Sequence, residues 1–389
     1  MKVAVCGAGI AGLTLANRLA AHGDEVVVLE RSPGPRRQGY MMDFFGPGYD
    51  AAEDMGLLPD ILEVSYEIQQ ASFVDSVGRA RAELPYDRLR DSLGGRLCSL
   101  MRPDLETVLR ESLPSSVELR FGAALTGVAD RGDQVHITLA DGTALQADLL
   151  VGADGIHSTV RGLVFGRESM FLRYLGFHTS AFVFDAPHIR DACRGRFALT
   201  DTVGHEMGFY VLRDGQVAAF GVHRTADPTL PDDAREAVRS AYRGLGWVVP
   251  EALAQCPPSD EVYYDQVAQI EMPRWTRGRI TLIGDACHAV SLLAGQGASL
   301  AVAGANLLAA QLHTAESMPQ ALSGYERLWR PVTEEKQKAG RAAARWFLPD
   351  NRLALWIRRA VLKLAAIPPV NRAVGALIAG KPDGAPGRK

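Results

Sequence analysis

The order of apolar and polar positions in the first thirty residues predicts a β-strand, an α-helix and a second β-strand. Residues 2–6 are rich in Val and Ala, as in a strand that is buried on both faces of a parallel sheet. Residues 10–21 are helix formers, and Gly23 follows them as a stop signal. Residues 25–29 form a second apolar run that ends at Glu30. The chain therefore opens with a βαβ unit.

The next patterns predict further pieces of the same domain. Residues 31–48 are rich in Pro, Gly and Arg, which indicates a long irregular excursion, and residues 50–62 resume a helical pattern. A second helix is expected from Arg102 to about Leu113, because Pro103 suits a first helical turn. Short apolar runs between turn residues predict strands at 71–84, 117–121, 125–129, 135–139, 145–147, 149–151 and 279–283.

The segment from about 167 to 271 has a different, β-rich character. Strands are expected at 208–212, 217–222 and 262–270, with one clear helix at 232–245. We therefore expect an α/β fold, in which a Rossmann-like nucleotide-binding domain carries an inserted, mostly antiparallel β-sheet domain and a C-terminal helical region. The predicted domains are 1–70 with 96–166 and 272–320; 71–95 with 167–271; and 321–389.

Composition restricts the class of protein. Of the 389 residues, 47% are hydrophobic and 22% are charged, which excludes a disordered chain, and the net charge of −3 gives no field that favours nucleic acid. The five cysteines are scattered and lack ligand spacing, so we expect no metal site, no disulfide framework and a cytoplasmic location. The apolar stretch at 353–379 is interrupted by basic residues and two prolines, which predicts an amphipathic helix and no transmembrane segment. The composition indicates no protein partner.

A glycine-rich turn follows the first strand and leads into the first helix. Gly7 permits a tight turn, Gly9 lets a pyrophosphate approach the backbone, and Gly12 lets helix and strand pack closely. The helix N-terminus adds backbone N–H donors and a positive dipole end. Glu30 lies 18 residues after Gly12, near the position of a ribose-binding acid. The pattern favours a dinucleotide site over a purely structural glycine turn.

Two later motifs place a carboxylate after a buried strand. Asp154 lies in the segment Gly152–Arg161, and Asp285 follows Gly284 shortly before a third glycine-rich turn at 294–297. Because the carboxyl ends of parallel strands meet at one edge of a sheet, the three strand ends could bind one elongated ligand together.

These three motifs together resemble the single-component, class A flavoprotein monooxygenases, the group that includes para-hydroxybenzoate hydroxylase and the tetracycline-inactivating monooxygenases. The resemblance covers most of the chain through about residue 312 and is weak within 167–271. It implies FAD and NAD(P)H as cofactors. The cofactor-binding positions that it implies are Gly7, Gly9, Gly12, Glu30, Arg31, Arg102, Asp154, Asp285, Gly295 and Gly297.

The resemblance also implies individual roles. Arg102 matches an arginine that reaches the phosphate or ribityl side of FAD, and Asp285 matches an aspartate that hydrogen-bonds the ribityl chain. Asp154 matches an aspartate linked to both FAD and the nicotinamide nucleotide. Gly295 and Gly297 precede a helix whose N-terminus would stabilise negative charge on reduced flavin.

Other positions leave two interpretations open. Arg36 and Arg37 are either NAD(P)H contacts or part of a solvated basic loop. The aromatic residues of the inserted sheet either form an apolar lid over the flavin or are plain sheet core; the substrate candidates among them are Phe209, Tyr210 and Phe220. His288 is either a base or a structural, hydrogen-bonding histidine, and its place at a strand-to-helix turn favours the structural interpretation. The sequence also departs from the family pattern, with Leu292 in place of proline, Ser299 in place of asparagine and Gly304 in place of an acid.

The resemblance implies that the protein inserts one oxygen atom from O2 into a hydrophobic, aromatic or polyketide-like small molecule through a flavin C4a-(hydro)peroxide. A non-catalytic flavin- or nucleotide-binding protein is one alternative. A flavin-dependent reductase or halogenase of related fold is another, although the sequence lacks their WxWxIP and PxxYxWxFP motifs. A colourless NAD-dependent dehydrogenase is a third.

Overall fold

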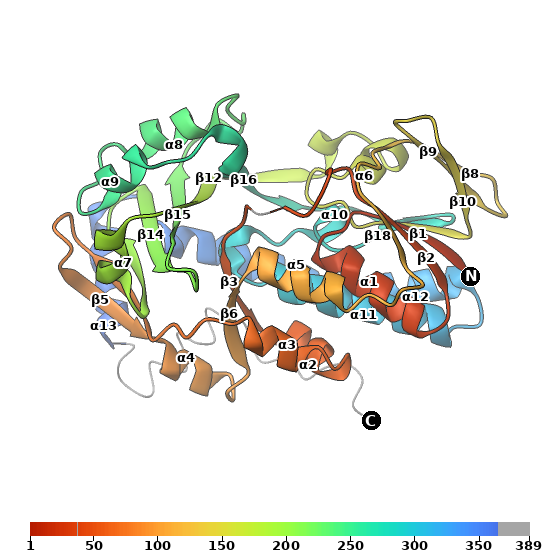
Figure 1. Cartoon of the computed structure of the whole chain (residues 1–389), viewed down its shortest axis with the longest axis horizontal. Helices are drawn as coiled ribbons and strands as arrows, with labels where there is room; N and C mark the ends of the chain where they lie inside the picture. The colour runs from red at the N-terminus through yellow and green to blue at the C-terminus, as the bar shows by residue number, and fades with distance from the viewer. Residues whose placement is uncertain (37, 365–389) are drawn as a thin grey trace.

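Two β-sheets, one in each half of the molecule, form the framework of the protein (Figure 1). The computed structural model describes residues 1–36 and 38–364. The six-stranded sheet lies on the right in Figure 1 and has the strand order β17-β18-β11-β1-β2-β7. Its strands are β1 (Lys2–Cys6), β2 (Glu25–Leu29), β7 (Glu118–Arg120), β11 (Leu149–Gly152), β17 (Thr276–Arg277) and β18 (Ile280–Leu282). All neighbouring pairs are parallel except β17 with β18.

Helix α1 (Ile10–Ala21) packs on β1 and β2, as the opening pattern predicts. It also contacts α5 (Arg102–Glu111) and α11 (Gly297–Thr314). The central strands are apolar on both faces, because helices cover one side and a small sheet contacts the other; its strands are β8 (Leu125–Asp130), β9 (Val135–Leu139) and β10 (Ala144–Ala147). The doubly covered parallel sheet confirms the α/β fold class.

The seven-stranded sheet on the left in Figure 1 has the order β16-β12-β15-β14-β13-β4-β5. Its strands are β4 (Gln70–Val74), β5 (Ala80–Pro85), β12 (Leu172–Phe184), β13 (Arg196–Thr200), β14 (His205–Val211), β15 (Val217–Arg224) and β16 (Tyr263–Ile270). Only β13 with β4 is a parallel pair. These strands come from the two segments of the predicted inserted domain, whose exact limits stay a prediction.

Three helices cover one face of this sheet, where the sequence predicts one. They are α7 (Pro187–Cys193), α8 (Ala234–Tyr242) and α9 (Val249–Ala254). The expectation of a single helix is therefore wrong. Helices α7 and α9 span two turns or fewer, which is too short for a clear 3.6-residue period.

The expectation of an irregular segment at 31–48 is wrong for residues 41–48, although the described residues of 31–40 form no helix or strand. Residues Met41–Phe45 form β3, which pairs antiparallel with β6 (Leu97–Met101), and α2 (Pro47–Asp54) follows. The partner of β3 lies more than fifty residues away, so local composition gave no sign of it. The remaining short elements are α3 (Leu58–Glu63), α4 (Tyr86–Ser92), α6 (Thr159–Val164), η1 (Glu168–Met170), η2 (Ser259–Glu261), α10 (Asp285–His288) and η3 (Leu292–Ala294).

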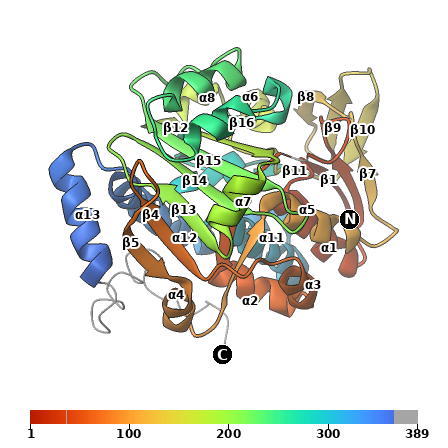
Figure 2. The same cartoon turned by 60° about the vertical axis from the view of Figure 1, so that its left-hand side comes forward.

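Two helices form the C-terminal region. The 30-residue α12 (Met318–Phe347) packs against α11 and η3, and α13 (Arg352–Leu364) lies beside β5 at the outer edge of the seven-stranded sheet (Figure 2). The rest of the predicted amphipathic segment, 365–379, lies outside the described residues. Within residues 1–36 and 38–364, no helix has both the length and the hydropathy needed to cross a membrane.

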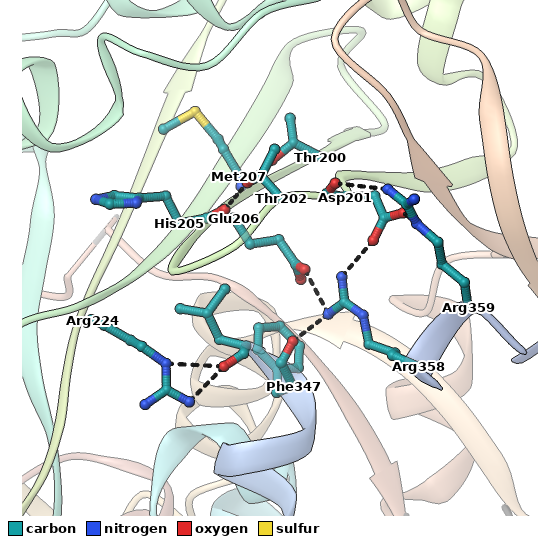
Figure 3. A network of polar contacts seen from close by, with 11 residues as sticks. Thr200, Asp201, Thr202, His205, Glu206, Met207, Arg224, Phe347, Arg358 and Arg359 are labelled. Carbon is teal, nitrogen blue, oxygen red and sulfur yellow. Dashed lines mark hydrogen bonds and ion pairs between the residues drawn. The ribbon is translucent and has the colours of Figure 1, made fainter. Parts of the chain in front are cut away.

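A buried network of charges fastens α13 to the seven-stranded sheet (Figure 3). The Arg358 guanidinium lies 2.8 Å from Asp201 Oδ1 and 2.9 Å from Glu206 Oε2, and all three side chains are almost completely buried. Arg359 donates a second bond to Asp201 at 2.5 Å. Burial raises the pKa of Glu206 to about 7, and Arg358 opposes that shift. The carboxylates therefore depend on α13 for their counter-charges.

Candidate functional site

The three glycines of the first turn occupy positions with three different steric requirements. Gly7 has φ +108°, and a Cβ there would lie 2.5 Å from the carbonyl oxygen of Ala153. A Cβ on Gly12 would lie 2.0 Å from the carbonyl oxygen of Gly7. At Gly9 a Cβ would meet nothing closer than 3.8 Å, because the residue faces an open cleft. The turn therefore presents bare backbone to the cleft, as a phosphate site requires.

Glu30 connects the glycine turn to the end of β2. Its carboxylate accepts hydrogen bonds from the backbone N–H groups of Ala8 and Ser32, both at 2.9 Å. Arg36 lies 3.9 Å from the same carboxylate and lines the cleft together with Arg31. Arg37 lies outside the described residues. An acid at the end of β2 thus lies beside the glycine turn, where a ribose would be bound.

The cleft continues past Arg102 at the start of α5. The Arg102 side chain pairs with Glu106 at 2.9 Å, and its backbone N–H donates to the carbonyl of Tyr40. Burial alone would lower the pKa of Arg102, but Glu106, Tyr40 and their neighbours raise it above its usual value. Arg102 is therefore a fixed cation in the wall of the cleft.

Asp154 lies in the cleft beside Gly7, but its carboxylate is engaged by its own loop. It accepts hydrogen bonds from Ser158 Oγ at 2.5 Å and from the N–H of Val160 at 3.0 Å. Burial raises its pKa, and these two bonds oppose the rise. Asp154 thus shapes the turn that leads into α6.

Arg161 ties the two later motifs together, a role that the sequence did not reveal. Its side chain is completely buried and donates to the carbonyl of Ala286 at 2.9 Å and to Glu168 at 2.8 Å. The loop of Asp154 is thereby connected to α10, which begins at Asp285.

Asp285 lies beside the third glycine-rich turn. A Cβ on Gly297, the first residue of α11, would lie 4.0 Å from Asp285 Oδ1, and Gly295 adopts a left-handed conformation with φ +65°. The Asp285 side chain is accessible to solvent, yet the surrounding walls reduce its hydration and raise its pKa, while Arg102 lowers it. A solvent-accessible carboxylate therefore lies next to a helix N-terminus.

Aromatic side chains from both halves of the molecule lie beside these charges. The ring of Tyr40 lies 5.3 Å from Tyr263 and 6.0 Å from Phe220, measured between centroids. Burial raises the pKa of Tyr40 to about 12; Arg102 opposes the shift. Phe220, Tyr40 and Tyr263 thus form one aromatic cluster near Arg102, and the role of Phe220 toward a substrate stays a prediction.

The other two predicted substrate residues do not reach the cleft. Phe209 is fully buried on the opposite face of the sheet, where it packs against Phe184 and Trp247 beneath the covering helices. Tyr210 points toward β3 but is 1% exposed, and its hydroxyl accepts a hydrogen bond from the N–H of Met41 at 2.7 Å. Both residues are sheet core, because every interior position of β14 is buried on either face.

Two of the departures from the family pattern have a structural reason. Ser299 Oγ accepts from the N–H of Gly48 at 2.9 Å and donates to the carbonyl of Phe45, so it ties α11 to the β3–α2 connection. A Cβ on Gly304 would lie 2.6 Å from the indole nitrogen of Trp329, so glycine makes room for that ring. His288 is buried against Trp275, in agreement with the structural interpretation.

Comparison with known proteins decides the family. A family model described as "FAD binding domain" matches residues 1–336. A flavin-dependent monooxygenase from an unknown prokaryotic organism is 30% identical over 351 residues, which cover 87% of this chain and 88% of the relative. The chain belongs to the class A FAD-dependent monooxygenase family.

Solved structures of similar fold agree with this family. The crystal structure of the tetracycline destructase Tet(51) matches this monooxygenase with a TM-score of 0.82 and 24% identity, over 100% of this chain and 99% of the other. Klebsiella pneumoniae HpxO, solved with FAD and uric acid, matches with a TM-score of 0.80 and 21% identity, over 99% and 98% of the two chains. At these identities the likeness concerns the fold.

The residues of this monooxygenase fit FAD. The unobstructed face of Gly9 suits a pyrophosphate, Glu30 suits a ribose, and the solvent-accessible Asp285 suits a chain of hydroxyl groups. Arg102 supplies a positive charge between them. The combination is what an elongated, anionic dinucleotide requires.

Proposed function

We propose that the protein uses NAD(P)H and O2 to insert one oxygen atom into a hydrophobic, aromatic or polyketide-like small molecule. The observation that carries the proposal is that Gly9, Glu30 and Arg102 line one cleft, and that Tyr40 and Asp285 lie close enough to Arg102 to interact with its charge. The bound FAD would supply the chemistry, since it accepts a hydride from NAD(P)H and activates O2.

Side chains of the protein would bind FAD and keep water away from the reacting atoms. Glu30 would accept hydrogen bonds from the ribose, Arg102 would pair with phosphate, and Asp285 would accept hydrogen bonds from the ribityl hydroxyls. The positive end of α11 at Gly297 would stabilise the negative charge that reduction adds to the flavin. Tyr40, Phe220 and the sheet behind them would keep water from the reacting atoms.

Arg36 and Arg37 are the proposed contacts for NAD(P)H. Arg36 is half exposed at the rim of the cleft and holds Glu30 only at 3.9 Å, so its guanidinium is available to an incoming phosphate. Phe220 is the proposed substrate contact that remains from the sequence-based set. We also propose a cytoplasmic location, because all five cysteines are buried and unpaired.

Purification followed by a substrate screen tests this function. We expect a yellow protein that oxidises NAD(P)H faster when a suitable aromatic compound is present, and a product heavier by one oxygen atom. A yellow protein that consumes NAD(P)H only at a basal rate with every aromatic or polyketide-like compound would favour the non-catalytic alternative. A colourless protein that reduces NAD without FAD would contradict the proposal entirely.

A further inference from the structure

His157 lies at the junction between the two halves of the molecule and contacts a carboxylate on each side of its ring. Its Nδ1 lies 3.0 Å from Glu168 Oε1, and its Nε2 lies 3.2 Å from Asp265 Oδ1. A neutral imidazole has one N–H, so it could donate to only one of them. Two ionised carboxylates at hydrogen-bond distance therefore require the imidazolium form.

The electrostatics agree with this geometry. The hydrogen bond to Asp265 raises the pKa of His157 to about 9, with partial burial opposing and Glu168 adding to the rise. His157 belongs to the loop that begins at Asp154, whereas Asp265 belongs to β16 of the seven-stranded sheet. The contact therefore joins the six-stranded half of the molecule to the seven-stranded half.

Asp265 lies close to Asp285, the carboxylate proposed to bind the ribityl chain. Asp265 and Tyr263 are two residues apart on β16, so their side chains lie on the same face of the strand, and the ring of Tyr263 contacts that of Tyr40. The charge of Asp265 raises the pKa of Asp285. Without a counter-charge, Asp265 would add a second negative charge next to an anionic cofactor. His157 is the cation that contacts it.

We propose that His157 is a positioning residue for FAD, which neutralises Asp265 and holds β16 against the loop of Asp154. The inference rests on the proposed placement of FAD in the cleft. Glu168 completes the arrangement, because it holds the other ring nitrogen and also accepts from the buried Arg161. Arg161 in turn donates to the backbone carbonyl of Ala286 in α10. Successive contacts therefore connect Asp265 on β16 with the helix that begins at Asp285.

A double-mutant cycle tests the charge relation directly. The variants are His157→Asn, Asp265→Asn and the two combined, with His188→Asn as the matched control, because His188 is an exposed histidine that pairs with Glu251. Each apoprotein is titrated with FAD by fluorescence, and the reduction potential of bound flavin is measured against a reference dye. Far-UV circular dichroism checks that each variant is folded.

We expect His157→Asn to raise the FAD dissociation constant roughly five- to thirtyfold, which is the effect of one charge acting across a partly desolvated site. The potential should also fall, since an uncompensated carboxylate opposes reduction. The double variant should bind FAD within about threefold of the wild type, and the control should not differ from it. If His157→Asn does not fold, Asp265→Asn alone must bind FAD at least as tightly as the wild type and raise the potential.

Two results would overturn the inference. An unchanged FAD affinity and reduction potential in His157→Asn would show that the charge of Asp265 does not affect the bound cofactor. If the double variant binds FAD as weakly as His157→Asn does, the histidine has a structural role and does not act by neutralising Asp265. Failure of the wild-type protein to bind FAD would instead contradict the proposed function, so the two failures are distinguishable.

Discussion

Replacing Gly9 by alanine separates ligand binding from folding at the glycine turn. The added Cβ would project into the cleft, with Arg102 Nη2 and Glu106 Oε1 as its nearest neighbours at 3.8 Å. It would occupy the space through which a pyrophosphate approaches the backbone. We expect FAD affinity to fall about 10- to 150-fold, which corresponds to losing one charged hydrogen bond of roughly 1.5 to 3 kcal/mol.

The stability of the apoprotein should hardly change in this variant. Gly9 has φ −84° and ψ −176°, which alanine adopts without strain, and it is the N-cap of α1. Alanine is a poorer N-cap than glycine, but it also restricts the unfolded chain, and these opposing effects are each below about 1 kcal/mol. We expect the free energy of unfolding to stay within about 0.5 kcal/mol of the wild type.

Gly12→Ala is the matched control, because it should lower the stability of the apoprotein, which Gly9→Ala leaves nearly unchanged. Its Cβ would lie 2.0 Å from a backbone oxygen, which cannot rotate away, and 3.3 Å from Val5. Overpacking of this kind costs about 1 to 3 kcal/mol. Urea unfolding of the apoproteins and FAD titration measure the two effects. Normal FAD binding by Gly9→Ala would show that no phosphate approaches this backbone, and a destabilisation as large as that of Gly12→Ala would show that position 9 has no room for a Cβ.

Three further perturbations have defined outcomes. Asp285→Ala should weaken FAD binding about 10- to 150-fold in the same titration, whereas the exposed control Asp191→Ala should not. Burial lowers the pKa of His223 and His288 to about 4, so between about pH 6.5 and pH 4 the unfolded chain binds protons that the native state does not, which should cost roughly 3 kcal/mol of stability per histidine. Glu206, whose pKa burial raises to about 7, opposes this loss, because its native state binds a proton over much of the same range. Stability should therefore fall by less than the two histidines alone would give, and a urea-unfolding profile that does not fall from pH 6.5 to pH 4 would contradict this. Arg358→Met leaves two buried carboxylates without their main partner and should cost about 3 to 5 kcal/mol of unfolding free energy; a loss below about 1 kcal/mol would show that solvent reaches them.

Local signals in the sequence predicted the nucleotide-binding half well. The strand, turn and helix at the N-terminus follow from contiguous residues, and the requirement for glycine at positions 7 and 12 is steric and short-ranged. Strand β3 could not be predicted in the same way. Its stability comes from pairing with β6, which the composition of 31–48 does not encode.

The sequence also does not reveal which individual side chains face the cleft. Neighbouring residues of a strand point to opposite faces, so an aromatic run such as Phe209-Tyr210 does not tell which member faces a ligand when both faces are buried. The contact between His157 and Asp265 joins residues 108 positions apart. The cofactor roles that the resemblance gave to the site residues all stay predictions, including those of Asp154 and Arg31, which line the cleft.

The charged anchor of α13 also makes the order of synthesis matter. Asp201 and Glu206 leave the ribosome about 150 residues before Arg358 does, as the sequence separations of 157 and 152 require. Until then the β13–β14 hairpin holds acids with no guanidinium to pair with them, and burying them is unfavourable. Burial of these acids is therefore a late event of biogenesis, and any version of the chain cut before Arg358 would leave them without their partner.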